Sequence, residues 1–292
     1  MRSYYEATAR ERLAGILDPG SFREILPPTT RTLSPHLQAL DLPTAFDDGV
    51  VIGAGSLDQL PVLIAAQEGG FMGGAVGEVQ GAKIVGLLER ACNEAVAGVV
   101  LLLESGGVRL QEANAGLIAV SEIIRAICTA RVAGIPVIAA IGGQYGCFGG
   151  TGIAAACCTS VVMSEEGRLG LSGPEVIETA RGVEEFDSRD RALVWRTVGG
   201  KHRFLLGDCD FLVDDRQHAF RAGIARALRE GHRLDLDAVL GEQALLDERL
   251  ARFGQCGDGE DIWRELGFDQ PENVPLLATD ALVAIGQRLR AA

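Results

Sequence analysis

Two glycine pairs, each directly after a short apolar run, are the residues whose types and spacing best suit chemistry. Gly106-Gly107 lies in Ser-Gly-Gly-Val-Arg after the run 99–104, and Gly149-Gly150 ends a glycine-rich segment that follows the run 136–141. Glycine lets the backbone approach a ligand closely, and two N–H groups converging on one carbonyl form an oxyanion hole. The alternative is that these glycines only end strands, as glycine does in any α/β fold.

Other side chains offer less. Cys147 has no histidine near it in the sequence to act as its base, and no His/Cys/carboxylate set has metal-ligand spacing. The seven cysteines are odd in number and form no Cys-x-x-Cys pair, which indicates reduced thiols of a cytoplasmic protein. Glu104 ends an apolar run, and we expect it to be a paired structural carboxylate rather than a group that faces the site.

The elements that must position the glycine pairs alternate between apolar runs and helical patterns. We expect paired strands at 49–56 and 60–67, later strands at 99–105, from 136 and at 160–164, and helices at 78–97, 113–131, 151–158 and from 175. This order predicts a layered α/β domain.

The two ends of the chain have different patterns. The N-terminal part predicts a helix at 4–17, one further helical turn at 22–26, and an extended arm at 27–43 that carries four prolines and suits wrapping a partner. Helices are expected at 213–231, 236–253 and 280–290. We therefore divide the chain into an N-terminal helix and arm, 1–45, and one α/β domain with C-terminal helices, 46–292.

Composition excludes some partners. The 292 residues are 47% hydrophobic and carry a net charge of −13, which disfavours binding to nucleic acid or to anionic membrane. The N-terminus has no apolar signal region, and no uncharged apolar run reaches the ~18 residues of a membrane span. The stretch 182–207 is basic, and it is either a solvated face or a binding surface.

Several motifs resemble the carboxyltransferase family, the crotonase-like subunits of acyl-CoA carboxylases and their relatives. They are Phe-Met-Gly-Gly-Ala-Val-Gly (71–77), Gly-Ala-Lys-Ile (81–84), Ser-Gly-Gly-Val-Arg-Leu-Gln-Glu (105–112), Gly149-Gly150 and Leu-Ser-Gly-Pro-Glu-Val-Ile-Glu-Thr (171–179). The resemblance implies the crotonase-like (ClpP/crotonase) fold, a ββα spiral. It also implies that each active site lies between two related domains, of which this chain carries one.

Within this family the chain is most similar to the beta subunits of biotin-independent malonate decarboxylases, because of the segment 142–150 and the run 182–203. It lacks the four-cysteine zinc ribbon of bacterial acetyl-CoA carboxylase and a Met-Lys-Met biotin motif. The resemblance implies decarboxylation of a malonyl thioester through an enolate, with no tightly bound cofactor and the substrate on the phosphopantetheine-type arm of an acyl carrier protein. The implied partners are a gamma subunit, the acyl carrier protein and an acyl-transferring alpha subunit.

The resemblance also suggests roles for individual residues. Backbone amides near Gly106, Gly107, Gly149 and Gly150 would hold the enolate oxygen, and Tyr145 would either supply the proton or serve in packing. Substrate or carrier binding is expected from Phe71, Gly73, Gly74, Arg109, Arg196, Lys201 and Arg203. No metal ligand is expected.

Two other functions remain open from the sequence. A carboxyltransferase that passes the carboxyl group to biotin uses the same enolate, so the glycine pairs do not distinguish it. A non-catalytic scaffold subunit is the other alternative, and the two intact glycine pairs argue against it.

Overall fold

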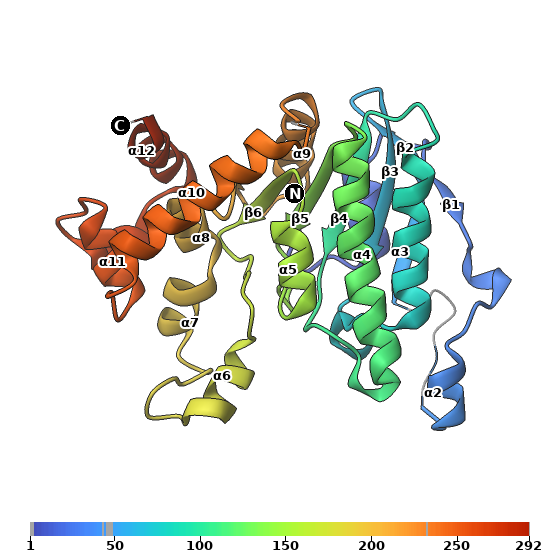
Figure 1. The fold of residues 1–292 in the computed structure, drawn as a ribbon, viewed down its shortest axis with the longest axis horizontal. Helices are drawn as coiled ribbons and strands as arrows, with labels where there is room; N and C mark the ends of the chain where they lie inside the picture. The colour runs from blue at the N-terminus through green and yellow to red at the C-terminus, as the bar shows by residue number, and fades with distance from the viewer. Residues whose placement is uncertain (1–2, 43, 45–48, 232, 292) are drawn as a thin grey trace.

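A seven-stranded sheet runs through the chain, with helices on both of its faces (Figure 1). The computed structural model describes residues 3–42, 44, 49–231 and 233–291. The strands lie across the sheet in chain order: β1 (Arg23–Ile25), β2 (Val50–Leu57), β3 (Leu60–Gln67), β4 (Gly98–Leu103), β5 (Val137–Ile141), β6 (Ser160–Ser164) and β7 (Phe211–Val213). The pairs β1–β2 and β2–β3 are antiparallel, and the pairs from β3–β4 to β6–β7 are parallel.

The central strands are buried on both faces, as their continuous apolar runs predict. In β4, Val99, Leu101 and Leu103 join the core under one helical layer, whereas Val100 and Leu102 join the core under the other. Successive side chains of a strand point to opposite faces, so one apolar run serves both layers.

The helices form two layers and a lateral group. One face carries α3 (Glu78–Ala91), α4 (Asn114–Val132) and α5 (Gly150–Ala156), and the other carries α1 (Ala9–Ile16) and α9 (Gln217–Arg229). On the β7 side lie α6 (Pro174–Arg181), α7 (Arg191–Val198), α8 (Gly200–Leu206), α10 (Leu236–Phe253), α11 (Gly259–Glu265) and α12 (Thr279–Ala291) (Figure 1).

The predicted α/β class is confirmed, as are the β2–β3 pair and the strands β4, β5 and β6. The helical turn predicted at 22–26 is wrong, because residues 23–25 pair with β2 as a strand. The helix predicted from 213 begins at Gln217, and strand β7 precedes it.

The predicted arm contains the short helical segments Pro28–Thr30 and α2 (Pro35–Ala39), while positions 43 and 45–48 lie outside the described residues. The division at residue 45 stays a prediction.

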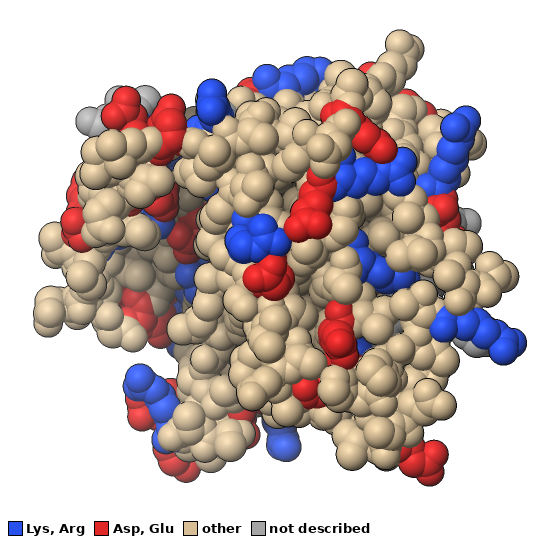
Figure 2. Space-filling model, turned by 45° about the vertical axis from the view of Figure 1, so that its right-hand side comes forward, with Lys and Arg blue, Asp and Glu red and all other residues tan. Residues whose placement is uncertain are grey.

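Charges are mixed on the face drawn in Figure 2, where Lys and Arg lie beside Asp and Glu across a largely uncharged surface. On α4, Arg125 pairs with both Glu89 and Glu122. Among the described helices, none is long and apolar enough to cross a membrane.

Candidate active site

The two glycine turns touch each other at the carboxyl ends of β4 and β5. Gly107 has a φ of +123° and Gly149 a φ of +61°, both in the region that favours glycine. A Cβ on Gly149 would lie 3.2 Å from the Cα of Gly107, and one on Gly107 would lie 3.7 Å from the Cα of Gly149. The structure thus brings together the two segments that the sequence singled out.

Most amides of these turns already donate hydrogen bonds within the protein. Gly106 N–H donates to the Gly73 carbonyl (2.8 Å) and Gly149 N–H to the Leu171 carbonyl (2.9 Å). Gly107 N–H donates to Ser105 Oγ (3.1 Å). By contrast, no acceptor in the described part of the chain takes the N–H of Val108 or of Gly150. One amide from each turn is therefore available to a ligand.

The second turn is fastened to the first by backbone hydrogen bonds. Ser105 N–H donates to the Gly146 carbonyl (2.8 Å), and Phe148 N–H donates to the Ser105 carbonyl (2.9 Å). Cys147 N–H donates to the Arg168 carbonyl (2.8 Å) on the other side. The segment 146–148 is therefore held between two neighbouring loops, so the relative position of the glycine turns is set before a ligand arrives.

Cys147 itself is fully buried, and burial raises its pKa well above the ordinary range of a thiol. This agrees with the expectation that it is not a nucleophile. Within the ranges that the structure describes, no group of three or more His, Cys, Asp or Glu side chains could hold a metal ion.

Tyr145 lies beside the first turn and reaches solvent, with 44% of its surface exposed. Its ring covers Gly69 and Gly73, since a Cβ on these residues would lie 2.4 Å and 3.9 Å from ring carbons. The ring is therefore placed at the surface near both glycine turns, where it could meet a substrate.

Glu104 is the buried group behind this arrangement. Its carboxylate forms an ion pair with Arg12, and both side chains are almost fully buried. The other carboxylate oxygen accepts the backbone N–H of Tyr145 at 3.2 Å. Arg12 Nε also donates to the Tyr4 carbonyl (3.1 Å). Through Glu104, Arg12 links α1 to the loop of Tyr145. The expected structural role of Glu104 agrees with this geometry.

Sequence analysis missed Arg12, which stands 92 positions before its partner. The sequence held one sign of a buried side chain at this place, which is the glycine at positions 69 and 143. A Cβ at either position would lie within 2.6 Å of the Glu104 carboxyl carbon, so both residues make room for the carboxylate.

Residues 71–74 wrap the first turn, as expected of a segment near the site. The Gly73 carbonyl accepts from Gly106, and a Cβ on Gly74 would lie 1.8 Å from the Glu104 carbonyl oxygen. Phe71 lies beneath the Arg109 guanidinium, 5.3 Å from ring centroid to Cζ.

Arg109 is buried and serves the fold. It pairs with Glu112 at 2.9 Å and donates to the Ala75 carbonyl at 3.1 Å. Burial raises the pKa of Glu112, but hydrogen bonds from Glu78 N–H and from Arg109 outweigh this and hold it below its usual value. The guanidinium thus braces the first turn from inside and is not presented to solvent.

The basic stretch does not form an open cationic surface, because several of its cations are paired. Arg196 pairs with Asp258 (2.8 Å), Lys201 with Glu165 (2.7 Å) and Arg203 with Asp208 (2.8 Å). Lys201 also donates to the carbonyls of Pro275 and Leu277. These three cations tie α7 and α8 to neighbouring segments, and the partners Asp258 and Glu165 lie far from them in the sequence.

A hollow of about 670 Å³ lies between α6, α7 and α11. It begins at Leu171, whose carbonyl accepts from Gly149, and its lining mixes apolar side chains such as Ile177 with Arg196 and Arg203. His202 also lines it, and burial lowers the pKa of this imidazole to about 4. The hollow connects the basic stretch to the second turn.

Known proteins resemble this chain along its length. A family model for the carboxyl transferase domain matches residues 4–222. A malonyl-S-ACP:biotin-protein carboxyltransferase of Malonomonas rubra is 39% identical over 312 aligned residues, covering 99% of this chain and 97% of that protein.

Solved structures agree. A chain in the crystal structure of a Pseudomonas malonate decarboxylase hetero-tetramer in complex with malonate superimposes with a TM-score of 0.83 at 42% identity, covering 91% of this chain and 97% of that chain. A chain of a Pseudomonas malonate decarboxylase hetero-dimer matches with a TM-score of 0.68 at 40% identity, covering 86% of this chain and 97% of that chain.

Proposed function

The chain belongs to the carboxyl transferase family, and we propose that it is the beta subunit of a malonate decarboxylase that acts on malonyl-S-acyl-carrier-protein. Family membership and the crotonase-like fold, both expected from the sequence motifs, are confirmed. Membership of this family supports an enzyme that acts on a malonyl thioester.

The contact between the two glycine turns carries the proposal. Decarboxylation breaks the bond between the malonyl α-carbon and its carboxylate, releases CO₂ and moves the electron pair onto the thioester carbonyl, which becomes an enolate oxygen. Preorganised N–H donors stabilise such an oxygen without any proton transfer. The amides of Val108 and Gly150, one from each turn and without acceptors in the described structure, are suited to this task.

The enolate carbon then takes up one proton to give the acetyl thioester. Tyr145 is our candidate for its delivery, directly or through water, because its exposed ring lies over Gly69 and Gly73 next to the first turn. Packing alone does not require a tyrosine at such an exposed place. No bound cofactor enters this reaction.

The hollow beside Leu171 is our proposed path for the phosphopantetheine-type arm of the carrier. Its largely apolar lining fits a long amide-bearing chain, and Arg196 and Arg203 also line it, each paired with an aspartate. Arg109 is not part of this path, because it is buried and does not line the hollow.

A gamma subunit would complete the site. Exposed aliphatic side chains surround the turns: Leu110 is 84% and Leu171 is 70% exposed, and Ile153 stands on the first turn of α5. Apolar surface this close to a polar site suits a partner face, and the similar Pseudomonas enzyme is a hetero-oligomer.

The test is decarboxylation of malonyl-carrier protein by this chain co-expressed with its gamma subunit in the absence of biotin. Release of CO₂ matched by acetyl-carrier protein supports the proposal. Avidin should leave the rate unchanged. Failure to release CO₂ from a purified complex would contradict it.

A biotin-dependent carboxyltransferase is the second candidate, because the Malonomonas rubra relative has that activity in its name. It predicts no CO₂ release without biotin, and transfer of the carboxyl group when a biotinylated protein is added. A scaffold role is less consistent with two glycine turns that contact each other and leave one amide each available.

A further inference from the structure

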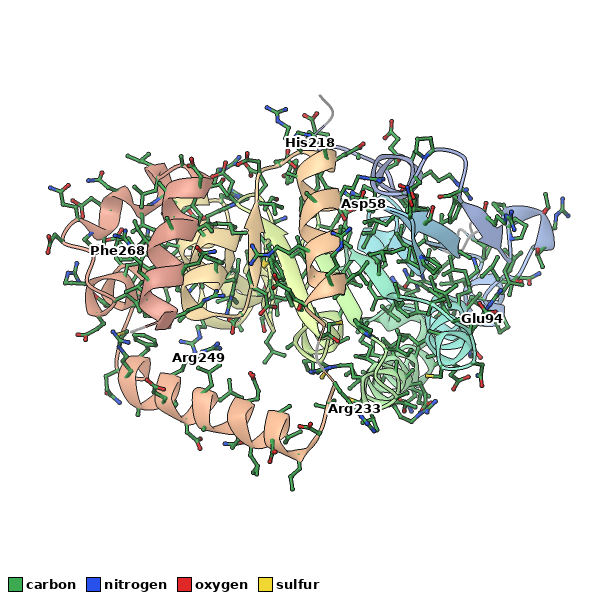
Figure 3. The ribbon with its side chains drawn as sticks, turned by 90° about the horizontal axis from the view of Figure 1, so that it is seen from above. Asp58, Glu94, His218, Arg233, Arg249 and Phe268 are labelled. Atoms are coloured by element: carbon green, nitrogen blue, oxygen red, sulfur yellow. The ribbon has the colours of Figure 1, made fainter. Side chains whose placement is uncertain are left out.

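Helix α10 is almost detached from the rest of the chain (Figure 3). None of its 18 residues is buried, and only Arg249 and Phe253 are partly covered. Seen from above, the helix runs beside the body rather than on it, with Arg233 just before its start and Arg249 near its end. It also lies beyond residues 4–222, which match the family domain. The shared fold and the glycine turns therefore do not depend on it.

Hydrogen bonds at its two ends hold the helix in place. Before the helix, Arg233 Nε donates to the Val132 carbonyl (2.9 Å) and Leu234 N–H to the Arg131 carbonyl (3.3 Å). At the other end, Arg249 pairs with Asp208 (2.7 Å) and Arg252 donates to the Glu265 carbonyl (2.7 Å). The middle of the helix has no such support.

One side of α10 is an apolar stripe made of Leu236, Val239, Leu246 and Leu250. Their spacing of three, seven and four residues places them on one helical face. Leu236 is 70% and Leu250 is 72% exposed. In proteins, most of the stability of a helix comes from packing of its apolar face. We therefore expect another surface to pack on the apolar stripe.

The charges beside the stripe indicate the chemistry of that surface. Asp237, Glu242 and Glu248 form no ion pair within the described part of the chain, whereas the cations Arg249 and Arg252 are committed to the body. The free charge of α10 is thus negative. A second copy of this chain, with a net charge of −13, would be repelled, and so would an acidic carrier protein.

We propose that α10 is a docking helix for the non-identical subunit of the proposed decarboxylase, and that it binds an apolar groove bordered by Lys and Arg on that subunit. This inference rests on the proposed function for the existence of that partner. The inference assigns the contact with that partner to α10 and states the chemistry of the partner's surface. The exposed side chains around the glycine turns would contact the partner at the active site. Helix α10 would contact the same partner at a second place, outside the active site.

The experiment measures the dissociation constant of the complex by sedimentation velocity, with this chain and the gamma subunit purified separately. The variant is the double substitution Leu246→Asp and Leu250→Asp, and the matched control is Leu276→Asp, an exposed leucine outside α10. We expect the double variant to weaken the complex by about 100-fold or more, as loss of central apolar anchors does. The control should change it by less than about threefold.

The substitutions should not change the stability of the fold, because the substituted side chains are exposed. The thermal melting of the isolated variants should match that of the wild type. Charge gives a second variant: Asp237→Lys with Glu248→Lys should weaken the complex at low ionic strength, and the difference from wild type should shrink in high salt.

Each result has a distinct meaning. An unchanged dissociation constant in the double aspartate variant, with a normal wild-type complex, overturns the docking helix and leaves the proposed function intact. A wild-type chain that binds no gamma subunit instead removes the pairing on which both rest. Self-association of the wild-type chain that the double variant abolishes would identify a second copy as the occupant and would also overturn the proposal.

Discussion

Gly149 combines a positive φ with a close neighbour in the other glycine turn. An alanine there would be strained in its backbone and would press on the Cα of Gly107. We therefore predict that Gly149→Ala lowers the kcat for malonyl-thioester decarboxylation by about 10²-fold or more, since it shifts the turn that presents the Gly150 amide.

The control is Gly134→Ala. Gly134 also has a positive φ, of +84°, but nothing lies within 4 Å of its Cβ position, between α4 and β5. The Gly134→Ala variant should lose a little stability and keep the kcat of the wild type. Equal losses of kcat in both variants would mean that backbone strain alone, rather than the geometry of the two turns, limits the rate.

The Arg12–Glu104 pair supports a prediction about stability. Removing one partner leaves a buried charge, so Glu104→Met and Arg12→Met should each destabilise the fold by about 3–5 kcal/mol. The double variant should recover much of this loss, because no unpaired charge remains. Urea unfolding of the three variants measures it, and additive losses would show that the pair is not coupled.

Among the elements, sequence patterns identified those with enough residues to show a period. The apolar runs of β3 to β6 and the long helix α4 were predicted within a few residues. The strands β1 and β7 have three residues each, too few for any alternation to appear, and pairing with a longer neighbour defines them. The helices α7 and α8 were missed because the stretch 182–207 was interpreted by its charge, and α11 was not predicted.

The same limit applies to the site. The contact of the glycine turns was predictable, because neighbouring parallel strands end at one edge of a sheet. The ion pairs of Arg196 and Lys201 were not predictable. Their partners, Asp258 and Glu165, come from separate loops, and only the folded chain brings them together.

The packing of α8 against α11 gives a pH-dependent prediction. His202 is buried near Gly259 and contacts the Trp263 ring edge, with centroids 5.9 Å apart. Burial lowers its pKa to about 4, against an ordinary value of about 6.5 in the unfolded chain. Between these values the unfolded state binds the extra proton, so the free energy of unfolding falls as the pH falls, by up to about 1.4 kcal/mol per pH unit.

Above pH ~6.5 and below pH ~4, His202 makes no contribution to the change of the free energy of unfolding with pH. A His202→Phe variant should lack this component, and the difference between the two proteins in urea unfolding across that window measures it. Parallel pH curves for variant and wild type would show that the imidazole is not kept neutral by the fold.

At the scale of the whole molecule, the proposed function requires a chain with a net charge of −13 to bind a carrier protein. Arg189 is an exposed cation of the basic stretch that has no ion pair among the described residues, whereas Arg196 is tied to Asp258. We predict that Arg189→Glu raises the KM for malonyl-carrier protein about threefold or more at low ionic strength and leaves kcat unchanged.

The comparison variant is Arg196→Glu, which breaks the pair with the residue that caps α11 and should lower thermal stability as well. Steady-state kinetics at two salt concentrations separate these effects. If the KM of Arg189→Glu equals that of the wild type at low salt, the carrier does not approach this face.

The attachment of the N-terminal segment has a consequence for biosynthesis. The amides of Tyr4 and Tyr5 donate to Asp215, and Arg12 needs Glu104. During synthesis, residues 3–16 leave the ribosome long before either carboxylate exists, and contacts so distant in sequence form slowly. Helix α1 therefore docks late, after translation has passed Asp215. Until then the apolar face of the sheet on which α1 packs stays uncovered by that helix.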